Sequence, residues 1–188
     1  MIELRSVIKK GGISVDFNEL AYARRSVRGF VDRDVSEGDV VKMLEAARYA
    51  PSAGNGQPWH FFVVRDKSVI KEIYDKSSGQ ESLMSAPLVV VVCAVTERSE
   101  AKYGRRGREL YCIQDTAAAI QNILLCAESL GLGGCWCGAF KEDAMSDILR
   151  LSAYKGDMRP VAFIPIGYPD SKPDARSRRS VEEIATFI

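Results

Sequence analysis

Two arginine-rich segments have the residue types that bind a phosphate group. The first covers residues 24–28 and the second covers residues 176–179, near the other end of the chain. Guanidinium groups make charge-assisted hydrogen bonds to phosphate oxygens, and two converging clusters would neutralise a dianion. The alternative is that both segments are solvated surface charge. The candidate phosphate ligands are Arg24, Arg25, Ser26, Arg28, Arg176 and Arg178.

A polar loop of small residues, 51–57, offers a second candidate site. Small side chains let the backbone approach a ligand closely, while the amides of Asn55 and Gln57 can both donate and accept hydrogen bonds. This chemistry suits a polyol or the edge of a heterocycle. The alternative, equally consistent with the sequence, is that the loop is an ordinary tight connection between a helix and a strand. The candidate ligands are Pro51, Ser52, Ala53, Asn55 and Gln57.

The glycine-rich segment 131–140 leaves its main chain accessible, so its N–H groups could donate to a flat ligand. Trp136 could instead be part of the core. Cys135 and Cys137 allow a redox or metal-binding interpretation, but same-face strand cysteines are more often inert packing. The candidate ligands here are Trp136, Cys137, Gly138 and Ala139.

Several common catalytic motifs are missing from the sequence. No G-x-G-x-x-G follows a strand, and neither a G-x-x-x-x-G-K-[ST] loop nor a G-x-S-x-G elbow occurs. His60 is the only histidine and there is no Cys-x2-Cys pair, which argues against a structural zinc site. We therefore expect no metal, and the missing motifs narrow the possible chemistry without assigning one.

The composition predicts one globular domain in a soluble, reduced, cytoplasmic protein. The chain has 188 residues, of which 46% are hydrophobic, and 26 basic residues balance 25 acidic ones. That balance gives no support for nucleic-acid binding. Five cysteines without a secretory signal do not suggest a disulfide scaffold. The longest apolar run, Pro87–Val95, is too short to span a bilayer.

Hydrophobic periodicity and capping residues predict α+β architecture with helices around one sheet. The helix 111–130 is apolar over most of its circumference, so we expect burial nearly all round and a second subunit beside it, with Gly131 as its C-cap. The other predicted helices are Asp16 or Asn18 to Arg24, Ser36–Tyr49, Asp66–Lys76 and Lys141–Leu151. The predicted strands are 59–64, 88–95 covered on both faces, 134–140 as strand or extended loop, and 161–167 with Pro165 at an edge or bulge. The predicted irregular segments are Met1–Val15 and the extended basic end Pro169–Arg179, before a last turn from Val181.

These segments, in this order, resemble the nitroreductase family. The matching pieces are RRSVRGF from Arg24, APSAGNGQPWHFFVV from Ala50, DTAAAIQNILLCAESLGLGGCWCGAF from Asp115 and GYPDSKPDARSRRSVEEI from Gly167. The likeness runs from about Phe17 onward, which leaves residues 1–16 as an unassigned N-terminal extension.

The resemblance implies a single domain over residues 1–188 with a nitroreductase-like three-layer fold. It also implies a central, mostly antiparallel sheet flanked by helices, and an intertwined homodimer with FMN at its interface. By this likeness the two arginine groups would hold the FMN phosphate and ribityl chain. The loop 51–57 would line the flavin, partly from the other subunit, and the backbone of 136–139 would approach the ring near N5.

The implied activity is transfer of hydride or electrons from NAD(P)H to a small planar acceptor by a ping-pong mechanism, with the chemistry at FMN N5. Residues 97–109 would form the cap over the substrate. Rival interpretations on the same scaffold are dehalogenation, flavin fragmentation, or flavin binding without NAD(P)H turnover. A basic nucleic-acid module is disfavoured, because aromatic residues are sparse around the arginines.

Overall fold

The architecture centres on one four-stranded sheet. The computed structural model describes residues 16–77 and 79–188, so the prediction for Met1–Val15 lies outside the described residues. The strand order is β1-β2-β4-β3, and every neighbouring pair is antiparallel. The strands are β1 (Trp59–Val64), β2 (Leu88–Val95), β3 (Gly133–Gly134) and β4 (Met158–Gly167).

β2 is the structural centre of the sheet because all eight of its residues are buried. Val90 and Val92 pack into the core on one face, while Val89 and Val91 pack into a second core on the other. β-branched side chains favour this extended, doubly covered geometry. The predicted strand covered on both faces is confirmed.

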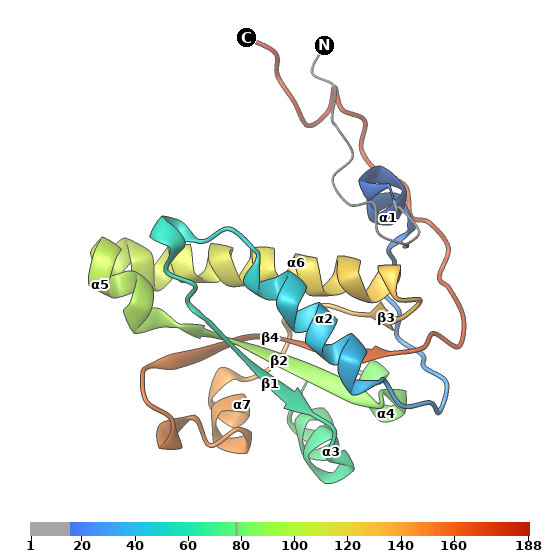
Figure 1. Cartoon of the computed structure of the whole chain (residues 1–188), viewed down its shortest axis with the longest axis horizontal. Coiled ribbons are helices and arrows are strands. Elements are labelled where there is room, and N and C mark those ends of the chain that lie inside the picture. The colour runs from blue at the N-terminus through green and yellow to red at the C-terminus, as the bar shows by residue number, and fades with distance from the viewer. Residues whose placement is uncertain (1–15, 78) are drawn as a thin grey trace.

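Helices cover both faces of the sheet and make three layers (Figure 1). On one side lie α2 (Glu37–Arg48) and α6 (Cys112–Ser129), and on the other lie α3 (Lys67–Lys76) and α7 (Glu142–Ile148). The remaining helices are α1 (Phe17–Ala23), α4 (Ser82–Ser85) and α5 (Thr96–Arg106). This arrangement confirms the α+β class and the mostly antiparallel sheet.

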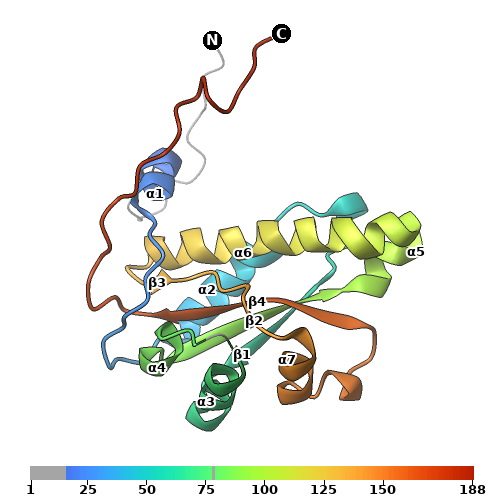
Figure 2. The ribbon, with the colours of Figure 1, turned by 180° about the vertical axis from the view of Figure 1, so that it is seen from behind.

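Predicted helix starts agree with the observed caps. The carboxylate of Asp16 accepts the N–H groups of Asn18 and Glu19 at 2.8 and 3.1 Å, and the Ser36 hydroxyl accepts the Asp39 N–H at 3.1 Å. Asp66 caps α3 in the same way. Residues 169–180 are extended up to a turn at Val181, as predicted, and run beside α1 away from the sheet (Figures 1 and 2).

α6 is only partly covered by its own chain. Ile120 and Ile123 are fully buried against the sheet, whereas Ile113, Ala117 and Leu125 are only half-buried. Within one chain only one face of α6 meets the sheet, so the expected burial nearly all round, which includes a second subunit, stays a prediction. Within the described residues, no helix is long and apolar enough to cross a membrane.

The structure corrects one detail of the predicted strands and decides between two alternatives for another segment. Pro165 lies neither at an edge nor at the register shift, which falls opposite Val92 and Cys93. Proline has no N–H to donate to a neighbouring strand. The Pro165 carbonyl points away from β2 and accepts the Cys135 N–H at 3.4 Å, so the ladder to β2 does not depend on this residue. Segment 134–140 is mainly an extended loop, one of the two predicted alternatives: only Gly134 belongs to a ladder, and isolated bridges join Cys137 to Phe163 and Phe140 to Ser77.

The predicted helix 141–151 is also too long at its C-terminal end. α7 ends at Ile148, and Arg150 adopts a left-handed conformation with φ of 51°. A separate 3-10 turn, Leu151–Ala153, follows. The chain turns at this point because it changes direction between α7 and β4.

His60 is the only histidine in the sequence, and the pKa of its ring reports how the side chains around it on β1 are packed. The His60 ring lies 4.7 Å from that of Phe62 and 5.9 Å from that of Tyr154. Burial, and then repulsion from Arg98, lower the pKa of His60. The unfolded chain therefore takes up the proton first, and stability should fall as pH drops through about 6.5.

An NMR titration of the one imidazole should give a pKa below that of an unstructured peptide. Urea unfolding of His60→Phe should lack this part of the acid destabilisation. A normal or raised imidazole pKa would contradict the account.

Candidate functional site

Backbone pairing brings the two arginine segments together. The Val27 N–H donates to the Gly134 carbonyl at 3.1 Å, which lays segment 24–28 beside β3. The Val31 N–H donates to the Tyr168 carbonyl at 3.0 Å, so the chain leaving β4 returns along the same segment. One cavity of about 90 Å³ results, lined by Arg24, Arg25, Ser26, Arg28, Pro173, Asp174, Arg176 and Arg178.

The positive charge around this cavity is not neutralised by the protein. In the described part of the chain, none of its five arginines forms an ion pair with a carboxylate. The Nε of Arg25 is buried without an acceptor. Asp174 is the one acidic residue in the lining. A buried donor without a partner is costly, so the cavity is suited to an anion.

The segment after β3 alternates between buried and exposed residues. Cys137 and Phe163 exchange two backbone hydrogen bonds of 3.0 Å each, which turns the Cys137 side chain inward. Trp136, Gly138 and Ala139 are exposed beside it, with Trp136 39% accessible. Among the described residues, the Gly138 N–H has no acceptor. This strip therefore presents free main-chain donors to a ligand.

The loop 51–57 is held firmly although its amide side chains are exposed. The Ala53 N–H donates to both carboxylate oxygens of Asp115, each at 3.1 Å, and the Ser52 hydroxyl accepts the Gln57 N–H at 3.0 Å. Asn55 and Gln57 have φ of 57° and 47°, a conformation that costs energy in a non-glycine residue. Such preorganised strain is common at binding sites.

Asp115 is a site residue that sequence reasoning missed. It begins one of the pieces that resemble the family without being assigned a role there, yet it is 8% accessible and anchors the loop. Burial raises the pKa of its carboxyl, and the N–H of Ala53 opposes that effect. An unexplained acid in an apolar helix was the available signal.

One chain does not bring the loop and the arginines together. The loop contacts Asp115 near the start of α6, while the arginine cavity lies beside Gly134, beyond the end of that helix. An 18-residue helix is about 27 Å long, and Figure 1 places α5 and α1 at its opposite ends.

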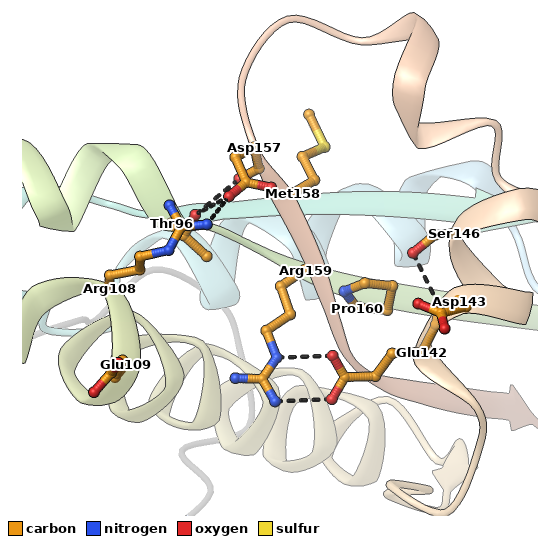
Figure 3. A pocket seen from close by; sticks show the side chains of 10 residues that line it. All are labelled: Thr96, Arg108, Glu109, Glu142, Asp143, Ser146, Asp157, Met158, Arg159 and Pro160. Atoms are coloured by element: carbon orange, nitrogen blue, oxygen red, sulfur yellow. Dashed lines mark hydrogen bonds and ion pairs between the residues drawn. The ribbon is translucent and has the colours of Figure 1, made fainter. Parts of the chain in front are cut away.

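A cleft of mixed charge reaches Gly138 of the exposed strip, and Figure 3 shows the residues that line one of its two parts. It consists of two cavities of about 290 Å³ each that share Glu109, Glu142, Arg159 and Pro160. Arg159 donates two hydrogen bonds to Glu142, at 2.9 and 2.8 Å, which lowers the pKa of that carboxyl. The cleft extends to Gly138. Its residues come from segments far apart in sequence, so no local motif marks them.

Comparisons with known proteins agree with this fold and site. The sequence profile of the nitroreductase family matches residues 21–82 and 76–168. A protein of Archaeoglobus fulgidus, provisionally named NADH dehydrogenase/NAD(P)H nitroreductase, is 37% identical over 157 residues, which are 83% of this chain and 87% of that protein. The chain belongs to the nitroreductase family, as its motifs suggest.

Two further relatives carry names that mention the cofactor. An FMN reductase (NAD(P)H) of Bacillus subtilis is 27% identical over 173 residues, covering 85% of this chain and 68% of that protein. A Desulfovibrio desulfuricans structure solved in complex with FMN superposes with a TM-score of 0.78 at 28% identity, covering 91% of this chain and 95% of the other.

Substitutions at two glycines test how closely β3 packs against the arginine segment 24–28. A Cβ at Gly133 would lie 2.7 Å from the Val27 Cβ and press on the arginine segment, whereas a Cβ at Gly138 would meet nothing within 4 Å. Gly133→Ala should therefore lower the free energy of unfolding by about 1–3 kcal/mol, as overpacking does. Gly138→Ala is the matched control and should unfold like the wild type. Urea unfolding measures both, and equal losses would refute this difference in packing.

Proposed function

We propose that this chain is an FMN-dependent oxidoreductase that passes electrons from NAD(P)H to a small planar acceptor, such as a nitroaromatic compound or a quinone. The observation that carries the proposal is the convergence of five arginines, from both ends of the chain, on one small cavity. Relatives named for FMN reduction or solved with FMN support the choice of cofactor.

The donor set fits the phosphate of FMN. A phosphate dianion would accept from the unpartnered Arg25 Nε and neutralise guanidiniums that no carboxylate reaches. Arg24, Arg25 and Arg28, with the Ser26 hydroxyl, would hold the phosphate and ribityl chain. Arg176 and Arg178 would close on the same phosphate from the C-terminal segment. A neutral ligand would leave this charge uncompensated.

The strip 136–139 would lie against the flavin ring. Its inward residue, Cys137, is fixed to Phe163, so the free Gly138 N–H is held at the exposed surface as a donor. When bound, FMN supplies hydride and electron transfer at N5, while the protein binds and orients it. That role needs no side-chain acid or base, so the absence of a catalytic side chain stays a prediction of the family resemblance.

We also propose that the working form is a homodimer. The half-buried face of α6, with Ile113, Ala117 and Leu125, needs a cover that one chain does not provide. A twofold pairing through this face would place the loop 51–57 of one subunit near the arginines of its partner. Ser52, Ala53 and Asn55 would then complete the flavin site, with Pro51 and Gln57 beside them.

The mixed-charge cleft would admit the donor and the acceptor in turn. It reaches Gly138, the end of the strip assigned to the ring, and one of its walls includes Arg108 and Glu109 from the cap segment 97–109. Because Glu142 and Arg159 neutralise each other, neutral planar molecules can enter without an unpaired charge being buried. Alternate use of one cleft predicts ping-pong kinetics.

Arg24→Ala tests the phosphate site. Loss of a charged hydrogen bond should weaken FMN binding by about 1.5–3 kcal/mol, or roughly 10- to 150-fold in Kd. Arg48→Ala on α2 is the control, since Arg48 forms an exposed pair with Glu45, stacks on Tyr49 and does not line the arginine cavity. Flavin fluorescence quenching on titration of the apoprotein measures both. Unchanged affinity in Arg24→Ala would remove that residue from the site.

Mixed dimers test whether the loop acts across subunits. Arg24→Ala and Asn55→Ala chains, differently tagged and co-purified, should give hybrids with one intact site and about half the wild-type NAD(P)H oxidation. Each homodimer of a single variant should be impaired. If the loop served its own subunit, every hybrid site would carry one lesion and activity would not recover.

A further inference from the structure

The mixed-charge cleft offers no unpaired cation to a negatively charged ligand. Its lining holds two arginines against four acidic residues. Both arginines are paired, Arg108 with Glu100 and Asp157, and Arg159 with Glu142. NAD(P)H carries a diphosphate between its two nucleosides, and the acids of this cleft would repel it. If the nicotinamide reacts in the cleft, the diphosphate must lie outside, against other cations.

Lys102 and Arg106 of α5 are exposed cations that the protein does not neutralise. Among the described residues, neither forms an ion pair with a carboxylate. Each is held against a tyrosine ring instead: the Lys102 Nζ lies 5.5 Å from the centre of the Tyr103 ring, and the Arg106 Cζ lies 5.4 Å from that of Tyr111. A ring restrains a cation without cancelling its charge. Both charges are therefore available to a ligand.

The two tyrosines join these cations into one cluster. The rings of Tyr103 and Tyr111 meet edge to face with their centres 5.3 Å apart, and the Arg106 Nε donates to the Tyr111 hydroxyl at 3.0 Å. The chain reaches this geometry through the π-helical turn Gly107–Tyr111, where a Cβ on Gly107 would clash with the Ser99 carbonyl. Turns of this kind are frequent at functional sites. The cluster is therefore held by the fold and differs from loose surface charge.

The cluster also lies on the loop 51–57. A Cβ on Gly54 would clash with the Lys102 ammonium group and lie 2.5 Å from the Tyr103 hydroxyl, so both groups rest on the bare backbone of this glycine. One turn earlier on α5, Arg98 donates to the Gln57 carbonyl at 3.1 Å and holds the other end of the loop. A ligand that touches this loop therefore approaches the Lys102 ammonium group.

We propose that Lys102 and Arg106 form an anion subsite that binds the diphosphate of NAD(P)H while the nicotinamide reacts in the cleft. This inference rests on the proposed function, which makes NAD(P)H the electron donor. The diphosphate carries two negative charges, which the two cations match. NADH and NADPH share this group, so the subsite serves both.

The position of the cluster suits this role. It touches the loop 51–57, which is proposed to line the flavin, and the cleft residues Arg108 and Glu109 follow it directly along the chain. The arginine cavity cannot serve the donor, because the FMN phosphate fills it in the proposed function. Lys102 and Arg106 therefore provide unpaired cations beside both the loop and the cleft wall.

Donors with and without the diphosphate test the subsite. In stopped-flow reduction of the FMN-loaded protein, Lys102→Ala and Arg106→Ala should each raise the apparent Kd for NADH about three- to tenfold and leave the limiting rate unchanged. Reduced nicotinamide riboside has no phosphate, so its apparent Kd and limiting rate should stay at the wild-type values. Lys71→Ala on α3, which removes a charge from an exposed pair with Asp75, is the control and should affect neither donor. Equal losses with both donors, or no loss with NADH, would overturn the subsite.

Calorimetric titration of the full chain with ADP tests the same residues without turnover. ADP has the diphosphate but no nicotinamide, and its binding should weaken in Lys102→Ala and Arg106→Ala but persist in Arg24→Ala. No binding, or binding lost only in Arg24→Ala, would overturn the assignment, the second by placing ADP in the arginine cavity. Tighter binding of adenosine 2′,5′-bisphosphate would assign the cations to the 2′-phosphate of NADPH and overturn the diphosphate. If no donor reduces the bound flavin, the proposed function fails, whereas the ADP titration still decides the subsite.

Discussion

The site depends on the backbone pairing of segment 24–31 with β3 on one side and with the returning C-terminal segment on the other. The Val27–Gly134 and Val31–Tyr168 hydrogen bonds join chain regions that lie far apart in the sequence. They force arginines from both regions around one cavity, where the cations repel one another unless an anion is present. This concentration of unpaired charge is maintained by the sheet, since β4 holds both β3 and the return path in place.

The same strip of chain combines two chemical environments. Its inward side supplies the buried thiols of the core, and its outward side supplies free main-chain donors next to a mixed-charge cleft. Because a strand alternates its faces, a ligand-facing surface and a thiol pair can occupy consecutive residues without competing for space. The arginines link these environments, as they border both the cavity and Cys135.

In one chain the loop 51–57 lies far from the arginine cavity, and this separation is the reason for the proposed dimer. Asp115 and Arg98 hold the loop in a strained, preorganised shape, yet its exposed amides find no ligand-binding partner at that end of α6. The partly buried face of α6 runs from the end of the helix that holds the loop to the end beside the arginine cavity. A twofold partner would satisfy both features at once, which is why the proposed cofactor site and the proposed dimer are one hypothesis.

Sequence alone determined the local features: caps at Asp16, Ser36 and Asp66, the fully buried strand β2, and the family motifs, because capping and hydrophobic periodicity act over a few residues. It also identified the arginine segments, but could not distinguish a binding cavity from solvated charge. Only the tertiary structure decided that they converge, that Asp115 anchors the loop, and that Glu142 and Arg159 form a cleft. The tertiary structure also corrected the expected place of Pro165 and the end of the predicted helix 141–151. These features depend on contacts between distant segments, and such contacts are set by strand order and packing rather than by any local pattern.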